Sequence, residues 1–475
     1  MKSFYITTTL PYVNAEPHIG FALEIVTADA LARYHRLIGD EVVFNTGTDE
    51  HGQKIYQKAK AQGKTPQEYV DEYAQKFADL KSALDLSYTH FVRTTDKHHQ
   101  QAAQEFWRRC LKNGDIYKSR YQVKYCVGCE MEKTDSELVD GRCPLHPDKE
   151  LELRNEENYF FRFSRYENTL LKLYENKDFV KPAGKLKEIR AFVQAGLKDF
   201  SISRVKSKMP WGVPVPDDED QVMYVWFDAL VNYISTLGWP DDQKTFEKFW
   251  GTETNPNAVQ IAGKDNLRQQ AAMWQAMLLS AHLPPSKQIL INGFINVNGQ
   301  KMSKSLGNVI SPFEMVKRYG PDATRFLLLN LGPVGEDMDV SWERFDTEYT
   351  AYLANGLGNL ASRVAKMASQ TQATYNLKES GFKPEIKQAF DQIEIKKAVE
   401  EIRRQVETQD KYLSETKPWL LEPEEKVKVL SPVINQVAQI AYQLQPLMPE
   451  TAKILLHHFS QKKIKPLKPL FPRVK

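Results

Sequence analysis

The sequence predicts an α/β protein in which a parallel sheet is split by an insertion and followed by an all-α helix bundle. Three observations indicate this arrangement. Strand-like and helix-like segments alternate through residues 1–114, the alternation is lost over residues 115–213 and returns over residues 214–297, and the pattern from residue 351 onward is almost entirely helical. A chain of 475 residues with 41% hydrophobic residues is long enough to form about three domains with apolar cores.

The first half of the sheet is expected within residues 1–114, where short apolar runs alternate with segments of helical periodicity. The expected strands are Phe4–Thr9, Glu41–Asn45 and His90–Arg93. The expected helices are Gly20–Ile38, Gln67–Leu84 and Lys97–Asn113. Such alternation is typical of a parallel sheet.

Residues 115–213 are predicted to form an insertion, because they contain three of the four cysteines and show little regular alternation. The second half of the sheet is expected over residues 214–297, with a helix-like stretch at Val222–Leu237, a strand at Ala258–Ile261, a helix at Leu267–Ala281 and a strand at Gln288–Ile291. Residues 298–350 then begin with a hairpin turn at Asn298-Gly299.

Residues 351–475 are expected to form the bundle, with periodic segments at Tyr352–Ala368, Ile386–Leu413, Lys426–Tyr442 and Thr451–Phe459. This part holds 20 lysines and arginines against 13 aspartates and glutamates, a balance of +7. Since the whole chain carries +3, the first 350 residues carry −4. The positive excess suggests a polyanionic partner for the bundle, although a basic solvated surface would give the same excess.

The location of the protein can also be judged from the sequence. No run approaches the roughly 20 apolar residues of a membrane-spanning helix. The N-terminal residues MKSFYITTTL enter a strand-like pattern without the long apolar core of a signal peptide. We therefore expect a cytoplasmic protein that does not contact a membrane.

The turn Pro17-His18-Ile19-Gly20 joins the first strand to the first helix. It can be an ordinary helix start, with Asn14 or Glu16 as the cap and Pro17 in the first turn. It can also be a nucleotide site, because such a turn aims free backbone N–H groups at an anion and glycine lets a ligand lie against the backbone.

A second loop, Lys301-Met302-Ser303-Lys304-Ser305, offers two lysines three positions apart, with Gly307 and Asn308 behind them. Such a loop can be a solvated turn. Mobile lysine charges also suit a triphosphate, because they can follow negative charge that develops on the phosphates. Together the two loops favour a nucleotide site more strongly than either loop alone.

The motifs PHIG and KMSKS, on the two sides of a split α/β sheet, resemble the paired signature of class I aminoacyl-tRNA synthetases. From about Phe4 to Trp419, further motifs occur in the order of the methionyl-tRNA synthetases: LPYVNAEPHIG, GTDEHG, CVGC, CPLH, ENYFFR, SISR, PWGVPVP, YVWFDAL, GKD, KMSKSLGN, GNLASR and KPWL. The resemblance implies a split Rossmann-like catalytic domain, a connective insertion with a zinc knuckle, a stem-contact region and an α-helical anticodon-binding bundle. It also implies that ATP activates L-methionine to methionyl-adenylate with release of pyrophosphate, and that the methionyl group passes to the 3′ end of tRNA(Met), initiator tRNA included.

The resemblance assigns the ATP site to His18, Gly20, Lys301, Ser303 and Lys304, with Mg²⁺ accompanying the ATP. The methionine carboxylate would attack the α-phosphate in line, so the enzyme holds the reactants and stabilises charge. His18 would donate to a phosphate, Gly20 would give adenine room, and Lys301 and Lys304 would neutralise the departing pyrophosphate. Phe21 departs from the family, which usually has a second histidine there, and a phenyl ring donates no hydrogen bond to phosphate.

The resemblance also implies a methionine pocket, in which Asp49 would bind the ammonium group. The residues that match the side-chain pocket are Leu10, Tyr12, Trp226, Ala229, Tyr233 and Gln270. Aromatic rings pack well against sulfur, although core packing would explain Trp226 and the tyrosines equally. Asn266 and Gln270 depart from the family, which usually has an aliphatic residue and a histidine there, so we expect methionine to be kept in a pocket with a more polar wall.

Three cysteines and a histidine occur in the spacing Cys126-x₂-Cys129-x₁₃-Cys143-x₂-His146, as paired hooks on turns that contain glycine or proline. Thiolate and imidazole ligands suit tetrahedral Zn²⁺, and a site with four protein ligands is structural. We therefore predict one structural zinc ion per chain, with reduced turns that hold no metal as the alternative. Cys110 lies in a helical pattern and is expected to be a small core residue.

In the bundle, Asn359, Arg363 and Trp419 match the positions that read the CAU anticodon in the family. A tryptophan after a proline can stack on an unpaired base, and Asn and Arg can bond to base edges. A contact between helices would be the alternative role for these residues.

Other class I synthetases are the nearest alternatives. Those for leucine, isoleucine and valine carry a large editing insertion, for which residues 115–213 leave no room, and the cysteinyl enzyme uses zinc at the amino acid. A tRNA-binding paralogue without catalysis would not need the KMSKS lysines, and a plain nucleotidyltransferase would not need a basic bundle. No appended domain of the kind that dimerises some family members follows the bundle, so we expect a monomer.

Overall fold

The computed structural model describes residues 2–129, 131–133, 137–302, 307–371 and 373–473. Its centre is a parallel sheet in the order β3-β2-β1-β12-β13-β7. The bounds are β1 (Ser3–Thr7), β2 (Glu41–Thr48), β3 (His90–Arg93), β7 (Val180–Lys181), β12 (Ala258–Gly263) and β13 (Gln288–Asn292). The two halves of the sheet meet where β1 pairs with β12, so the predicted split parallel sheet is confirmed.

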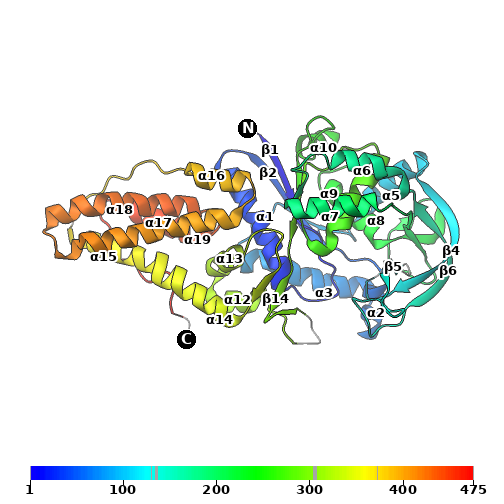
Figure 1. The fold of residues 1–475 in the computed structure, drawn as a ribbon, viewed down its shortest axis with the longest axis horizontal. Helices are drawn as coiled ribbons and strands as arrows, with labels where there is room; N and C mark the ends of the chain where they lie inside the picture. The colour runs from blue at the N-terminus through cyan, green and yellow to red at the C-terminus, as the bar shows by residue number, and fades with distance from the viewer. Residues whose placement is uncertain (1, 130, 134–136, 303–306, 372, 474–475) are drawn as a thin grey trace.

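Helix α1 (Ile19–Leu37) follows β1 and is buried along most of its length. It lies between the sheet and the bundle in Figure 1. The expected cap at Asn14 or Glu16 is wrong, because His18 itself is the N-cap: its backbone is extended and its side chain accepts a hydrogen bond from the Gly20 N–H. Pro17 therefore lies before the helix instead of in its first turn.

Four further helices complete the first half: α2 (Gln53–Ala61), α3 (Pro66–Ala78), α4 (Leu80–Ala83) and α5 (Lys97–Lys112). Helix α2 was not predicted. The expected single helix over residues 67–84 is two helices that meet at Asp79. Thr65 and Glu68 form a capping box at the start of α3, which satisfies backbone N–H groups there.

The insertion forms an antiparallel sheet at the end of the molecule opposite the bundle (Figure 1). Its strands are β4 (Ile116–Cys126), β5 (Met131–Lys133), β6 (Glu152–Phe161) and β8 (Phe200–Ser201). The inserted residues also include α6 (Glu167–Leu173) and α7 (Ala183–Gln194), and β7 from this segment pairs with β13 at the edge of the parallel sheet. The insertion is thus more regular than its sequence suggested.

The second half of the parallel-sheet region, residues 214–297, differs from the prediction in two of its expected helices. The expected helix-like stretch Val222–Leu237 begins within β11 (Asp218–Met223), which pairs with β9 (Ser203–Val205) and β10 (Pro214–Val215), and continues as α8 (Val225–Ala229) and α9 (Asn232–Ser235). The expected helix Leu267–Ala281 contains a π-helical turn, Gln269–Met273, before α11 (Trp274–Ser280). Helix α10 (Gln243–Phe249) lies between these segments in sequence.

The predicted hairpin turn at Asn298-Gly299 is confirmed. It joins β14 (Ile295–Val297) to β15 (Gln300–Lys301), and both turn residues have positive φ, 52° and 75°. Strand β16 (Met338–Val340) pairs with β14. Helices α12 (Pro312–Tyr319) and α13 (Pro321–Leu329) precede β16 in the chain, and α14 (Trp342–Glu348) follows it.

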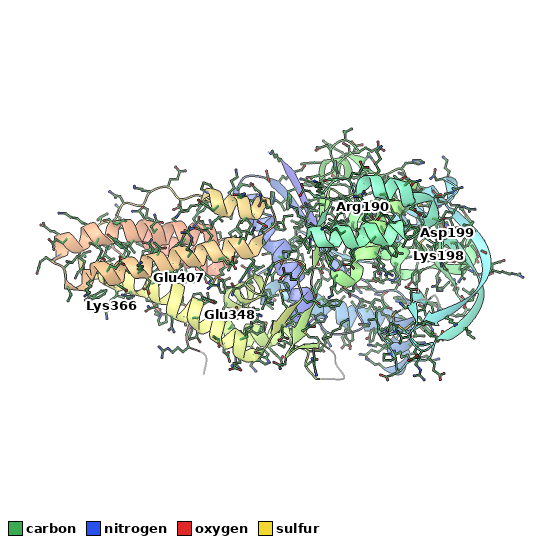
Figure 2. The ribbon with its side chains drawn as sticks, viewed as in Figure 1. Arg190, Lys198, Asp199, Glu348, Lys366 and Glu407 are labelled. Carbon is green, nitrogen blue, oxygen red and sulfur yellow. The ribbon has the colours of Figure 1, made fainter. Side chains whose placement is uncertain are left out.

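The bundle starts with a π-helical segment, Tyr349–Gly358, that continues into α15 (Asn359–Thr371). The other helices are α16 (Pro384–Asp391), α17 (Ile395–Thr416), α18 (Pro423–Leu444) and α19 (Pro449–Phe459). The expected helix Ile386–Leu413 is interrupted at Ile393, which has a φ of 60°. Charged side chains project from the surface of both parts of the molecule, such as Lys366 of α15 and Glu407 of α17 on the bundle and Arg190 of α7 in the insertion (Figure 2).

Within the part of the chain that the structure describes, no helix combines the length and the apolar character that crossing a bilayer requires.

Candidate active site

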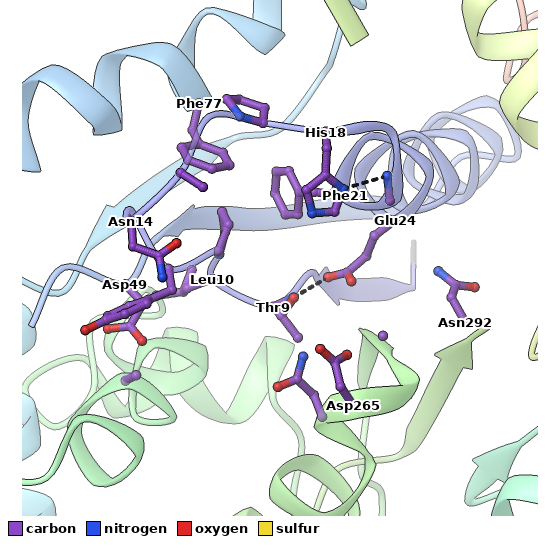
Figure 3. A pocket seen from close by; sticks show the side chains of 18 of the residues that line it. Thr9, Leu10, Asn14, His18, Phe21, Glu24, Asp49, Phe77, Asp265 and Asn292 are labelled. Atoms are coloured by element: carbon purple, nitrogen blue, oxygen red, sulfur yellow. Dashed lines mark hydrogen bonds between the residues drawn. The ribbon is translucent and has the colours of Figure 1, made fainter. Parts of the chain in front are cut away.

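A pocket of about 640 Å³ lies where the two halves of the sheet meet. Its walls come from the segments that follow β1, β12 and β13 and from the start of α1. Figure 3 shows Thr9, His18, Asp265 and Asn292 converging on it from these elements, and Asp49 from the segment that follows β2. The carboxyl ends of parallel strands at a change of strand order are the usual ligand site in open α/β sheets.

His18 and Gly20 stand at the pocket rim and depend on each other. The His18 Nδ1 accepts a hydrogen bond from the Gly20 N–H at 3.0 Å (Figure 3). A Cβ on residue 20 would lie 2.8 Å from His18 Cε1, which is closer than real Cβ contacts allow. Gly20 therefore makes room for the histidine ring, and Nδ1 as acceptor leaves the neutral ring with its hydrogen on Nε2.

Phe21 also lines the pocket, next to this turn. Its ring packs edge-on against Phe77 of α3 with 5.6 Å between ring centroids. The position at which the family usually has a second histidine thus presents an apolar wall between α1 and α3.

Glu24 is a pocket residue that sequence reasoning missed. Its Oε1 accepts hydrogen bonds from the Thr9 backbone N–H at 2.7 Å and from the Thr9 hydroxyl at 2.6 Å. Burial, helped by the nearby Asp265 carboxylate, raises the pKa of Glu24 to about 8, against the lowering effect of the Thr9 hydrogen bonds. A glutamate one turn into a helix gives no sequence signal of burial, so only packing reveals this group.

Lys301 reaches the pocket from β15, while Ser303 and Lys304 lie outside the described residues. The Lys301 Nζ lies 4.3 Å from the centroid of the Phe294 ring, and the Lys264 Nζ lies 4.1 Å from the same centroid. The Asp337 carboxylate pairs with Lys264 at 2.6 Å. Phe294 and Asp337 thus hold two lysine ammonium groups beside the pocket.

The residues expected to bind methionine line the same pocket: Leu10, Tyr12, Asp49, Trp226, Ala229, Tyr233 and Gln270. Asp49 is buried opposite Tyr12, and its backbone N–H and C=O bond to Pro11 O and Val13 N. Tyr233 is anchored through its backbone carbonyl, which accepts a hydrogen bond from the Tyr5 hydroxyl at 2.7 Å.

The motifs GTDEHG and YVWFDAL meet behind this pocket. His51 Nδ1 lies 2.7 Å from Asp228 Oδ2, and both side chains are buried. Burial raises the pKa of Asp228, while His51 lowers it. This pair joins the segment that carries Asp49 to the segment that carries Trp226.

Two lysines one helical turn apart, Lys54 and Lys58 of α2, also line the pocket and were missed. Lys58 donates to the Asn14 carbonyl, and Lys54 lies 3.5 Å from the Gly128 carbonyl. The sequence signal that could have found them is their i, i+4 spacing, which places both side chains on the same face of a helix.

The predicted metal ligands come together beside the pocket. The ligand atoms of Cys126, Cys129, Cys143 and His146 all lie within 4.8 Å of one another. Cys129 Sγ is 3.4 Å from Cys143 Sγ and 3.2 Å from His146 Nδ1. Ligands 2.3 Å from a tetrahedral zinc would be about 3.8 Å apart, so the donor set fits this metal.

Gly128 explains the glycine in the CVGC turn. A Cβ on residue 128 would lie 2.4 Å from His146 Cγ, so only a glycine at this position leaves room for the histidine ring. Gly128 and Cys129 also line the pocket, so the metal cluster and the pocket share a wall. Cys110 is buried in the core, as predicted.

The residues expected to read the anticodon form a separate group in the bundle. Arg363 Nη1 lies 2.6 Å from Asp410 Oδ1, and its guanidinium carbon lies 5.7 Å from the centroid of the Trp419 ring. Trp419 is 47% exposed although the preceding Pro418 is buried. Asn359 begins α15 and is exposed.

These features define a class I aminoacyl-tRNA synthetase. They are the split parallel sheet, the pocket that the His18-Gly20 turn and the Lys301 loop share, and the helical bundle beyond it. The family profile described as tRNA synthetases class I (M) matches residues 4–152 and 145–365. By this match and the relatives below, the chain belongs to the methionyl-tRNA synthetase family of class I.

Individual relatives agree with this assignment. The methionine–tRNA ligase of Nostoc sp. is 41% identical over 473 residues, which cover 94% of this chain and 88% of that protein. That of Thermotoga maritima is 41% identical over 484 residues, which cover 96% of this chain and 75% of that protein. A Mycobacterium tuberculosis methionyl-tRNA synthetase in complex with methionyl-adenylate is 34% identical, with a TM-score of 0.91 over 100% of both chains.

Proposed function

We propose that the chain activates L-methionine with ATP, releases pyrophosphate, and transfers the methionyl group from methionyl-adenylate to the 3′ end of tRNA(Met), including the initiator tRNA. The observation that carries this proposal is that one pocket is lined both by residues expected to bind ATP, His18 and Lys301, and by residues expected to bind methionine, Asp49 and Tyr233. Membership of the family supports the choice of substrates.

In the proposed reaction, ATP enters as its Mg²⁺ complex, and the metal neutralises part of the phosphate charge. The neutral His18 ring donates its Nε2 hydrogen to a phosphate oxygen, because Nδ1 already accepts from Gly20. Lys301, together with Lys304 and Ser303, stabilises the departing pyrophosphate. The protein supplies no covalent nucleophile, since the methionine carboxylate attacks the α-phosphate directly.

The proposed methionine site places the ammonium group at Asp49. The thioether side chain lies among Leu10, Tyr12, Trp226, Ala229, Tyr233 and Gln270. A buried carboxylate is the natural partner of an ammonium group in a largely apolar pocket.

We further propose that Cys126, Cys129, Cys143 and His146 hold one structural Zn²⁺, which would tie the CVGC turn to the CPLH turn. The proposed domains are residues 1–114 and 214–297 for the catalytic domain, 115–213 for the insertion, 298–350 for the KMSKS loop and stem-contact region, and 351–475 for the bundle. A monomer in the cytoplasm remains the expected state.

The anticodon would bind at the exposed end of the bundle, where Trp419 stacks on a base and Asn359 and Arg363 bond to base edges. The basic excess of residues 351–475 favours an RNA partner there.

The test is ATP–pyrophosphate exchange with methionine, followed by charging of tRNA with and without the CAU anticodon. We expect methionine-dependent exchange and charging that requires CAU. Trp419→Ala should reduce charging at least tenfold with exchange unchanged, while Ile454→Ala, a change at another exposed apolar residue of the bundle, should alter neither. Absence of methionine-dependent exchange would contradict the proposed activity, and equal losses in both assays would contradict the role of Trp419.

A further inference from the structure

Two lysine ammonium groups share one phenyl ring at the border of the pocket. Lys264 Nζ and Lys301 Nζ lie 4.1 Å and 4.3 Å from the ring centroid of Phe294, which lines the pocket. The reaction described above gives Lys264 no role. Its neighbours in the chain, Gly263 and Asp265, both line the pocket, and Figure 3 shows Asp265 on the pocket wall. Lys264 is therefore a cation beside the pocket without an assigned function.

The ammonium group of Lys264 is paired with the carboxylate of Asp337. Its Nζ lies 2.6 Å from Oδ1 and 2.5 Å from Oδ2, and the lysine and aspartate side chains are 24% and 43% exposed. The hydrogen bond from Lys264 is the largest of the effects that lower the pKa of Asp337, so this carboxylate is ionised at neutral pH. An anion that reaches this side of the pocket would compete with Asp337 for the lysine.

Asp337 is the fixed member of the pair. Its Oδ1 also accepts a hydrogen bond from the Phe294 N–H at 2.9 Å, beside the pairing of β14 with β16. The carbonyl of Glu336 is packed closely against Gly293, where a Cβ would lie only 1.9 Å from the carbonyl oxygen. A lysine carries its charge on a flexible four-carbon stem, so Lys264 is the member that can move.

The shared ring brings Lys264 close to the group that the proposed reaction releases. Lys301 is proposed to stabilise pyrophosphate, and both ammonium groups lie against the same ring of Phe294. A polyphosphate at Lys301 is therefore within reach of Lys264 once this lysine leaves Asp337. Pyrophosphate carries several negative charges and Asp337 carries one, so the polyphosphate attracts the ammonium group more strongly than the carboxylate does.

We propose that Lys264 is a further phosphate-binding residue, which leaves Asp337 to bind the β- and γ-phosphates of ATP and the pyrophosphate formed from them. This inference rests on the proposed function. During activation a methionine carboxylate oxygen bonds to the α-phosphorus, and the bond from that phosphorus to the oxygen that bridges to the β-phosphate breaks. The bridging oxygen keeps the electron pair, and Lys264 pairs with the resulting charge without giving up a proton. Asp337 competes for the lysine and so limits how tightly pyrophosphate is held.

The first variant is Lys264→Met, which removes the charge and keeps a long side chain. We expect KM for pyrophosphate in ATP–pyrophosphate exchange to rise about tenfold, as for a lost charge-assisted hydrogen bond, while KM for methionine stays within about twofold. Lys264→Arg keeps the charge and should restore most of the affinity. Lys248→Met is the matched control, because Lys248 pairs with Glu41 at 2.6 Å outside the pocket, and its KM for pyrophosphate should equal that of the unchanged enzyme.

The second variant, Asp337→Asn, tests the competition. An asparagine oxygen still accepts from the Phe294 N–H, but it carries no charge to hold Lys264. We expect KM for pyrophosphate to fall about threefold, because the phosphate no longer competes with a carboxylate. In the Lys264→Met background the same change should leave KM for pyrophosphate as it was.

Three results would overturn the inference. An unchanged KM for pyrophosphate in Lys264→Met would show that the Lys264–Asp337 pair only joins the end of β12 to the loop before β16. A rise in Asp337→Asn would show that the carboxylate orients the lysine instead of competing for it. A fall of equal size with and without Lys264 would show that Asp337 acts on the phosphate directly. Failure of the proposed function would look different, because the unchanged chain would then show no methionine-dependent exchange.

Discussion

Glu24 places a carboxyl group inside a pocket that is proposed to receive a polyphosphate. Its burial and the nearby Asp265 keep it protonated at neutral pH. A neutral acid adds no repulsion towards phosphate, and its Oε1 still accepts from Thr9, which orients the end of β1. With its proton, Glu24 can accept the hydrogen bonds from Thr9 without repelling an anionic ligand.

We predict that Glu24→Gln removes a pH dependence of stability. The folded state keeps a proton on Glu24 up to about pH 8, whereas the unfolded chain loses it near the ordinary glutamate pKa of 4.5. The free energy of unfolding should therefore fall as pH rises between these values, by at most about 1.4 kcal/mol per pH unit. Urea denaturation at pH 5, 6.5 and 8 measures the slope, which should be smaller in the variant. Parallel slopes in the two proteins would contradict the assignment.

The CVGC turn is the element that connects the metal cluster to the pocket. Gly128 touches the His146 ring on one side, and its carbonyl lies near Lys54 on the other. Binding of a metal to residues on two separate turns orders both of them. The state of the metal should thus affect the pocket wall as well as the insertion.

We predict that Gly128→Ala lowers bound zinc from one ion per chain to well below one, because the added Cβ would displace His146. Pyrophosphate exchange should fall at least fivefold along with the metal. Metal analysis of the purified protein measures the first effect. Gly184→Ala is the control, since a Cβ there meets no atom within 4 Å. Full zinc content in Gly128→Ala would count against the ligand role of His146.

At the scale of the whole molecule, α1 connects the pocket to the bundle. Its first residues contact the pocket, and near its other end the Tyr34 hydroxyl bonds to Asp391 at 2.8 Å. Between them, Asp29 pairs with Arg325 of α13 at 2.7 Å, and both side chains are fully buried. Arg325 also donates to the carbonyls of residues 446 and 447, in the turn between α18 and α19. Catalytic domain and bundle are thus joined by a buried charge network.

We predict that Arg325→Met destabilises the protein by about 3–5 kcal/mol, because it removes one of the two guanidinium partners of the buried Asp29 carboxylate and the donor to three backbone carbonyls. Adding Asp29→Asn should recover part of this loss. Arg404→Met is the control, since the Arg404 side chain is 68% exposed and its pair with Glu401 should be worth at most about 1 kcal/mol. Urea denaturation measures the free energy of unfolding of all three variants. Equal effects of Arg325→Met and Arg404→Met would show that the buried network does not stabilise the junction.

Much of this molecule was predictable from local signals. The Asn298-Gly299 turn, the meeting of the three cysteines with His146 and the strand-helix alternation follow from residues close in sequence, and all three are found in the structure. Helix breaks at Asp79 and Ile393 and the cap at His18 were not predicted, because apolar periodicity continues across a break and a histidine rarely caps a helix.

The sequence by itself determined the fold class, the order of motifs and the residue types of the candidate site. Only the tertiary structure decided that Glu24 is buried and has a raised pKa, that Gly20 accommodates the His18 ring, and that Tyr233 accepts a hydrogen bond from Gln270. The physical reason is that burial and hydrogen-bond direction depend on groups far apart in sequence, such as Thr9 with Asp265 or Tyr233 with Gln270, which no local pattern brings together.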